Sequence, residues 1–154
     1  MFFLFFLEGI VMEKQNFENH VRFVPLFHYV LFGLLILTFI GSIVNLIKSF
    51  STPNLYSASL IFVISIMLAM MFVFMRQFSL KAQDRAIRAE ENLRHFAMTG
   101  KLLDSRLTIR QIIGLRFASD EEFLELAKKA AEENIAENDI KKLIKNWKGD
   151  YYRV

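Results

Sequence analysis

The chain has 154 residues, a formal charge of +3 and a hydrophobic fraction of 54% that is concentrated in its first half. This length allows one small domain plus membrane segments, and it excludes two independent enzyme domains. Residues 76–154 carry 16 Lys and Arg against 13 Asp and Glu, a balance that argues against a dedicated nucleic-acid-binding domain. The absence of cysteine excludes disulfides, thiolate metal sites and thiol catalysis.

The first residues are apolar but do not resemble a signal peptide. Residues 1–11 contain Glu8, are too short to cross a bilayer, and lack a basic region and a cleavage site. We therefore expect Met12 to be the natural start and residues 1–11 to be an extension of the reading frame; a short interfacial segment is the alternative. Residues 1–22 together form the expected N-terminal cytoplasmic tail.

Two long apolar runs follow this tail. Each has the length that crosses a bilayer, because roughly 20 helical residues at about 1.5 Å each match a hydrocarbon core of about 30 Å. We predict transmembrane helices over residues 23–48 and 55–76, joined by an external loop over residues 49–54 whose composition is typical of a turn. Pro25 at the start of the first span suits a first helical turn.

Basic residues near the spans predict the orientation of this hairpin. Lys14 and Arg22 precede the first span, Arg76 and further basic residues follow the second, and the connecting loop region contains only Lys48. Positive charges near membrane ends stay in the cytoplasm, so we expect both termini to be cytoplasmic.

Small and polar side chains recur at helical spacing in both spans. They are Thr38, Gly41, Ser42 and Asn45 in the first span, and Ala58, Ser65 and Ala69 in the second. Small residues let helix backbones approach closely in lipid, and polar ones can hydrogen-bond across the contact. We expect these residues to pack the hairpin internally; a homodimer seam is the alternative.

The second span continues as a polar helix, because no helix breaker appears before Thr99-Gly100. We predict one helix to about residue 97, with residues 77–98 as a cytoplasmic rod. Along it, apolar and small residues repeat in steps of four and three, as in a heptad seam: Met75, Ser79, Ala82, Ala86, Ala89, Leu93 and Phe96. The alanines make a weak dimer zipper, so we expect a neighbouring helix of the same chain to cover this seam. Asp84–Arg88, Glu90–Arg94 and Glu91–His95 have the spacing of i,i+4 pairs.

Helix-capping signals organise residues 99–154. Thr108 with Gln111 is a capping box. Ser119 with Glu122 is a second one, which predicts a helix over Asp120–Asn134.

Asn138 is a plausible third cap, which predicts a last helix over Asp139–Trp147. No segment alternates with period two for long enough to form a sheet. The predicted fold is therefore all-α: a two-helix transmembrane hairpin, a long cytoplasmic helix that continues the second span, and a small three-helix C-terminal domain.

Several motifs resemble one family of uncharacterised bacterial inner-membrane proteins. They are Asn19-His20, Arg22, Pro25 and Phe27-His28, then FSLKAQDRAIRAEE at Phe78–Glu91, LRFASDEE at Leu115–Glu122, and IKKLIKNWKGDYYRV at Ile140–Val154. The similarity covers Met12 to the last residue. The resemblance implies two spans in the inner membrane with a cytosolic tail, and it implies no activity.

Two groups of ionisable residues lie close to the predicted membrane. His20, Arg22 and His28 precede or begin the first span, and we interpret them as interfacial anchors, with lipid-headgroup binding as the alternative. They lack the carboxylates or thiolates that would complete a metal site. Lys81, Arg85 and Arg88, with Asp84, form a charged collar after the second span. We interpret this collar as topology-setting; lipid contact or docking of the domain are the alternatives.

The last predicted helix carries Lys141, Lys142 and Lys145 opposite an apolar stripe. We expect the stripe to pack against sister helices, with contact to an anionic membrane surface as the alternative.

No catalytic, cofactor-binding or metal-binding constellation emerges from the sequence. The leading hypothesis is a non-catalytic membrane-anchored scaffold or adaptor that presents a helical domain at the inner leaflet, with lipid and an unknown protein as partners. The alternative is a subunit of a small transporter, channel or lipid-handling assembly. The sequence leaves open whether the chain forms a homo-oligomer.

Overall fold

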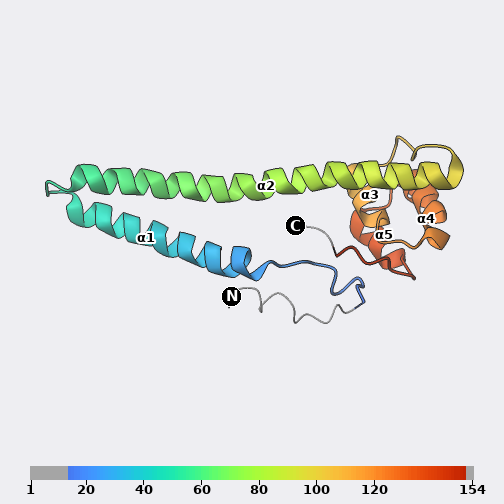
Figure 1. Ribbon diagram of the computed structural model, residues 1–154, viewed down its shortest axis with the longest axis horizontal. Coiled ribbons are helices and arrows are strands. Elements are labelled where there is room, and N and C mark those ends of the chain that lie inside the picture. The colour runs from blue at the N-terminus through green and yellow to red at the C-terminus, as the bar shows by residue number, and fades with distance from the viewer. Residues whose placement is uncertain (1–13, 152–154) are drawn as a thin grey trace, which may run out of the picture. The chain divides into compact units, whose positions relative to one another are not determined.

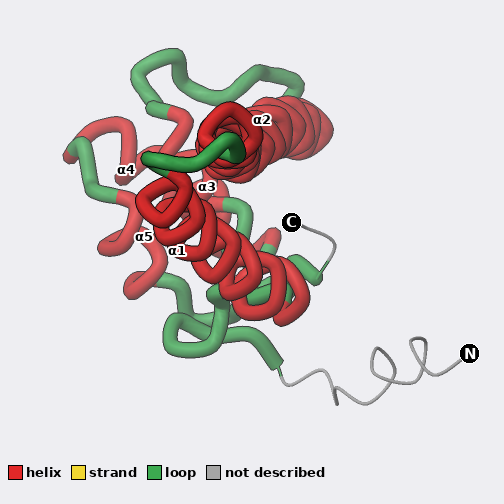
Figure 2. The backbone as a smooth tube through the Cα atoms, turned by 90° about the vertical axis from the view of Figure 1, so that its left-hand side faces the viewer, coloured by secondary structure: helices red, strands yellow, loops and turns green. Residues whose placement is uncertain are grey.

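The computed structural model describes residues 14–151, and this part of the chain contains helices and loops only, apart from one isolated antiparallel bridge between Ala118 and Trp147 (Figures 1 and 2). In chain order the elements are the π-helical turn η1 (Leu26–Leu31), α1 (Phe32–Ser49), α2 (Leu55–Thr99), α3 (Ile109–Leu115), α4 (Asp120–Glu133) and α5 (Glu137–Leu143). The predicted all-α fold is confirmed. The predictions for residues 1–11 fall outside the described residues.

The described chain divides into two compact units. One unit, the hairpin, is residues 22–85. The other, the helical domain, combines residues 86–151 with residues 14–21. The division lies within α2, which belongs to the hairpin over its first part and to the domain over its last.

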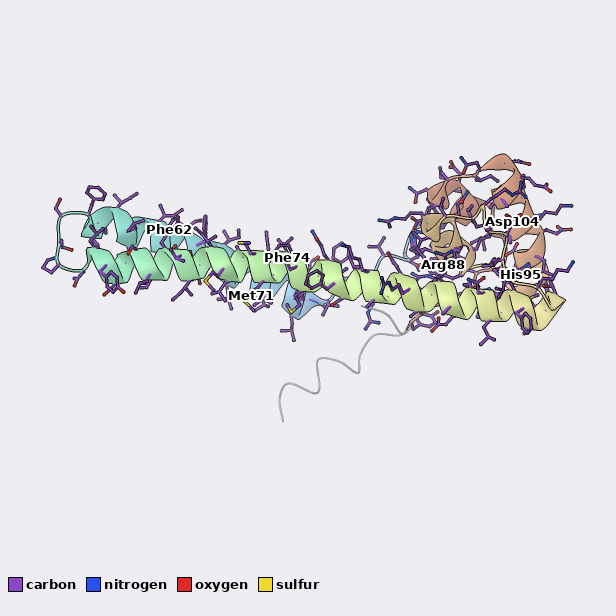
Figure 3. The ribbon with its side chains drawn as sticks, turned by 90° about the horizontal axis from the view of Figure 1, so that it is seen from above. Phe62, Met71, Phe74, Arg88, His95 and Asp104 are labelled. Carbon is purple, nitrogen blue, oxygen red and sulfur yellow. The ribbon has the colours of Figure 1, made fainter. Side chains whose placement is uncertain are left out.

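The hairpin runs out along η1 and α1 and returns along α2 after a short turn (Figure 1). The turn is closed by Thr52, whose backbone N–H donates to the Ser49 carbonyl at 3.0 Å. The helices touch through a few side chains only. Phe27 and Phe72 stack with ring centroids 4.5 Å apart. Most other apolar side chains point away from this contact, as Figure 3 shows along α2 around Met71 and Phe74.

The helical domain has a conventional buried core. Its largest fully buried side chains are Phe117, Phe123, Ile112, Leu115 and Ile140, which come from α3, α4, α5 and the segment that joins α3 to α4. Ile87 of α2 is buried in the same cluster. The domain thus removes these large apolar side chains from water, which is the main free-energy gain in folding.

The capping box of α3 is confirmed. Thr108 Oγ1 accepts from the Gln111 backbone N–H at 3.3 Å, and Gln111 Oε1 accepts from the Thr108 backbone N–H at 2.8 Å. The buried Gln111 amide also donates to the carbonyls of Ala130 and Ile135, at 3.2 and 3.0 Å. One glutamine therefore caps the start of α3 and satisfies backbone groups at the end of α4.

The second capping box was wrongly predicted, although α4 begins at Asp120 as expected. The Ser119 hydroxyl makes no capping hydrogen bond. The Glu122 carboxylate instead accepts from the backbone N–H groups of Lys145 and Asn146, at 3.1 and 2.9 Å. A tertiary contact has replaced the local one.

The prediction for the last helix is also wrong at both ends. α5 starts at Glu137, after Ala136 rather than Asn138, and it ends at Leu143 because Ile144 is extended. Beyond Ile144 the backbone pairs with the segment before α4: Lys148 donates to the Phe117 carbonyl at 2.7 Å. These hydrogen bonds satisfy backbone groups that a longer helix would have used.

The heptad seam of α2 is not covered by a helix of the same chain, contrary to the prediction. Ile87 and Glu91 are buried against the domain, whereas Ala86, Leu93 and Phe96 are exposed. The domain therefore packs on the side of α2 that carries Ile87 and Glu91, which is roughly opposite the heptad seam.

Candidate functional site

The segment before the hairpin docks on the helical domain. His20 packs against Phe117 and Trp147, with ring centroids 5.7 Å away in each case. Its Nδ1 lies 2.7 Å from the Phe17 carbonyl, and its Nε2 lies 3.4 Å from Lys141 Nζ. A carbonyl oxygen can only accept a hydrogen bond, so Nδ1 is the nitrogen that donates to Phe17.

Two further contacts fix this segment. Gln15 donates from Nε2 to the Asp150 carbonyl at 3.2 Å, and its Oε1 accepts from the Asp150 backbone N–H at 2.9 Å. Lys142 Nζ lies 5.9 Å from the centroid of the Phe17 ring. Sequence reasoning missed Gln15 and Phe17, because residues 14–21 carry neither helical nor strand periodicity, and it gave Asp150 no role.

The other two residues of the first predicted cluster belong to the hairpin. His28 is half-buried between Phe23 and Phe27, and its Nδ1 lies 3.0 Å from both the backbone nitrogen and the backbone oxygen of Val24. Arg22 is exposed. The cluster predicted as one group is therefore divided between two units, with His20 in the domain.

The charged collar lies on α2. Lys81, Arg85 and Arg88 are all exposed, and Asp84 is half-buried. The predicted Asp84–Arg88 pair is not formed in the described structure, and neither is Glu90–Arg94. The collar thus presents its charges outward, which is compatible with both the topology-setting and the lipid-contact interpretations.

The three lysines of the predicted last helix differ in their surroundings. Lys141 is buried and pairs with Glu137 at 2.6 Å. Lys142 is exposed and pairs with Asp139 at 3.0 Å. Lys145 is exposed and lies beyond the end of α5. These residues do not form one continuous basic face.

The small and polar residues of the hairpin separate into two sets. Ser42 of α1 and Ser65 of α2 are buried, with their hydroxyl oxygens 2.9 Å apart, and Ala58 of α2 is buried as well. Ala69 is half-buried. Thr38, Gly41 and Asn45 are exposed on α1, so they do not contribute to packing within one copy of the chain.

Arg94 connects α2 to α4 and to the segment before α4, whereas sequence reasoning assigned it only the spacing of a pair with Glu90. It binds Glu91 at 3.1 Å, Asp120 at 2.8 Å and the Ala118 carbonyl at 2.8 Å, and its guanidinium carbon lies 4.2 Å from the Phe123 ring centroid. Burial raises the pKa of the Glu91 carboxyl, although Arg94 opposes this effect. The hydrogen bond from Arg94 lowers the pKa of Asp120. The predicted Glu91–His95 pair is replaced: His95 Nδ1 lies 2.7 Å from the Lys101 carbonyl.

Two open cavities flank the segment that follows α2. One of 270 Å³ is lined by His95, Leu102 and Lys128, among others, and one of 390 Å³ by Arg88, Leu102 and Ser105. Figure 3 shows Arg88, His95 and Asp104 at this end of α2. Within residues 14–151, no group of three His, Asp or Glu side chains is arranged to hold a metal ion. The lining of the two cavities combines leucine side chains with basic groups and with Asp104, which lines both.

The model of a family of unknown function (DUF6526) matches residues 12–154. No curated protein matches the chain, and no solved structure matches it. The expected resemblance to a family without a known activity is confirmed at the level of the family.

Proposed function

The chain belongs to this family of unknown function, and we propose from its own residues that it is a non-catalytic, membrane-anchored scaffold or adaptor. In this proposal the hairpin crosses the bacterial inner membrane twice. The helical domain is held at the cytoplasmic leaflet, where it contacts a protein partner.

The observation that carries this proposal is that the apolar side chains of the two long helices are largely exposed. Leu26–Ser49 and the apolar part of Leu55–Thr99 are long and apolar enough to cross a bilayer, yet only 6% and 11% of these apolar windows are buried within the structure. A core helix of a soluble protein would be mostly covered by its own chain. Apolar surface of this extent needs lipid or another apolar cover.

The docking of residues 14–21 on the domain supports a location of both segments on the same side of the proposed membrane. Residues 14–21 pack on residues 86–151 within one unit, and the two apolar helices lie between them in sequence. A chain that crosses a membrane twice returns to the side from which it started. The basic residues on both flanks favour the cytoplasm as that side.

The domain's own contacts support a role in binding. The charged residues around Arg94 are engaged in holding α4 against α2. Its exposed apolar residue Leu102 lies between two open cavities. This arrangement suits a contact surface for another protein.

A second candidate is a subunit of a transporter, channel or lipid-handling assembly. Thr38 and Asn45 favour it, because polar side chains that face lipid are costly and are commonly satisfied by a neighbouring helix. Two helices alone cannot enclose a pore, so this function requires further helices from other subunits.

The test uses the absence of cysteine. Chains with single cysteines at positions 18, 54 or 105 (Glu18→Cys, Asn54→Cys, Ser105→Cys) are treated with a membrane-impermeant maleimide in intact spheroplasts and after lysis. We expect Asn54→Cys to react on the outside of intact spheroplasts, and the other two only after lysis. Reaction of Ser105→Cys in intact spheroplasts, or recovery of the chain in the soluble fraction, would overturn the proposal.

Photo-cross-linking distinguishes the two candidate functions. A photoreactive amino acid at Leu102 reports on the domain, and one at Asn45 reports on the exposed face of α1. An adaptor gives a discrete protein product from Leu102. Products from Asn45 alone would favour the transporter or channel subunit.

A further inference from the structure

The polar part of α2 has an apolar face that the helical domain does not cover. We call Ala82, Ala86, Ala89, Leu93 and Phe96 the exposed seam; Leu93 and Phe96 are 67% and 51% exposed, and the alanines are exposed as well. Successive residues of an α-helix are rotated by about 100°. The buried residues Ile87 and Glu91 therefore lie on roughly the opposite side of α2 from the seam.

We propose that a second copy of this chain packs in parallel against the exposed seam. The proposal rests on the membrane anchoring described above, because two copies inserted with the same topology present α2 in the same direction and at the same height. The alternating steps of four and three residues then bring like positions of the two helices together.

Charges beside the seam complement each other in this arrangement. In heptad notation Ala82 and Ala89 occupy position d and Ala86 occupies position a, so Arg85 is at g and Glu90 at the following e. In a parallel pair, g of one helix lies beside the next e of the other, and opposite charges there favour pairing. Arg85 of each copy would thus lie beside Glu90 of its partner, twice about the two-fold axis.

The structure leaves both of these side chains available for that contact. Arg85 and Glu90 are exposed, and neither forms an ion pair with any residue between 14 and 151. Arg94, which has the spacing to pair with Glu90, is bound to Glu91 and Asp120 instead. The domain thus uses one side of α2 and leaves a self-complementary side exposed.

Alanine at the seam permits close approach but buries little apolar area, and Leu93 and Phe96 supply most of the apolar contact. Confinement to a membrane raises the effective concentration of the two copies, which favours a pairing that would be weak in free solution. We therefore expect the dimer in membranes.

Cysteine cross-linking in native membranes tests the geometry. Ala89→Cys lies on the seam, and its neighbour Arg88→Cys lies at the same height but off it. Under mild oxidation we expect at least about fivefold more disulfide dimer from Ala89→Cys, since two seam residues face each other across the axis. Equal dimer yields from a chain that is recovered in the membrane fraction would overturn this proposal and leave membrane anchoring intact. Recovery in the soluble fraction would overturn both.

Charge reversal tests whether the two α2 helices are parallel and whether the neighbour is a second copy of this chain. Arg85→Glu or Glu90→Arg alone places like charges side by side, and either should lower the yield of the Ala89→Cys dimer about fivefold, as expected for two exposed ion pairs turned repulsive. The double variant should restore the yield, and so should mixing the two single variants. A loss that the double variant does not rescue, or a cross-linked product containing a different protein, would overturn the proposal. Unchanged Trp147 fluorescence verifies that each variant keeps its folded domain.

Discussion

The hairpin and the helical domain place their apolar side chains in opposite directions. In the domain, Phe117 and Phe123 are fully buried, whereas in the hairpin Leu37, Met71 and Phe74 point outward. Under the proposed membrane anchoring, this difference reflects two solvents for one chain. In that proposal lipid covers the apolar side chains of the hairpin, whereas the domain buries Phe117 and Phe123 in a core of its own. The same substitution should therefore have different consequences in the two units.

The largest difference is expected for removal of a phenyl ring. Phe123→Ala should destabilise the domain by about 3–5 kcal/mol, because it leaves a cavity beneath Arg94. Phe74→Ala, on the exposed face of α2, should change domain stability by less than about 0.5 kcal/mol. The measurement is urea unfolding of the full chain in mild detergent, followed by the fluorescence of Trp147, the single tryptophan. Equal shifts for the two variants would contradict the comparison.

Arginine substitutions at two equally exposed leucines give a second test of the difference between the hairpin and the domain. Leu37 in α1 and Leu102 after α2 are 68% and 66% exposed. Leu37→Arg should cost roughly 2.5–3.5 kcal/mol of membrane insertion, because it places a charge near the centre of the first span. Leu102→Arg faces water and should leave insertion unchanged. Carbonate extraction of membranes reports the inserted fraction. If both variants insert like the parent chain, lipid does not surround α1.

Glu91 gives the domain a pH dependence. Burial raises its pKa above the ordinary 4.5, so the folded state favours the protonated carboxyl. Stability should therefore fall as the pH rises from about 4.5 through the raised pKa, by about 1.4 kcal/mol for every tenfold change in proton affinity. Glu91→Gln should lose this decline, measured by Trp147 fluorescence in urea between pH 4 and 8.

Asp120 provides the internal control. Its pKa is lowered from 3.8, so its stabilising contribution is present above that pH and is lost as the pH falls. Asp120→Asn should change the acid side of the profile only. An unchanged decline above pH 4.5 in Glu91→Gln would show that Glu91 is not its source.

The smallest effect is expected at the serine pair of the hairpin. Each hydroxyl has one proton and lies 2.7 Å from a carbonyl of its own helix, so the one that donates across the contact gives up its bond to that carbonyl. Ser42→Ala should weaken the hairpin by about 0.6 kcal/mol. Energy transfer between dyes on two introduced cysteines, followed during SDS titration, measures this change; Thr38→Ala on the exposed face is the control. A loss of several kcal/mol would mean that the pair dominates hairpin packing.

Local signals predicted much of the fold. The start of α2 at Leu55, the start of α4 at Asp120 and the Thr108–Gln111 capping box each depend on residues a few positions apart. The wrong predictions for the second capping box and for the end of α5 share a cause: residues distant in sequence form hydrogen bonds in place of the expected local ones. Glu122 binds backbone near Asn146 rather than Ser119, and α5 stops where the chain begins to pair with Phe117.

The sequence indicated some residues of the candidate sites, but it hardly predicted which other parts of the chain these residues contact. His20 looked like part of a membrane-facing cluster with His28, but it packs between two aromatic rings of the domain. Arg94 was assigned a neighbour on its own helix and binds Asp120 of α4 instead. Periodicity identifies the faces of one helix, and it cannot identify which distant segment will cover them.

The pairing of Gln15 with Asp150 sets an order of events during translation. The two residues are 135 positions apart, which at about 5–20 residues per second separates their synthesis by roughly 7–27 s. During that interval the ribosome has already synthesised residues 14–21 of the domain but has not yet reached Asp150. The segment around His20 therefore stays without its complete docking surface until the stretch around Asp150 has been synthesised.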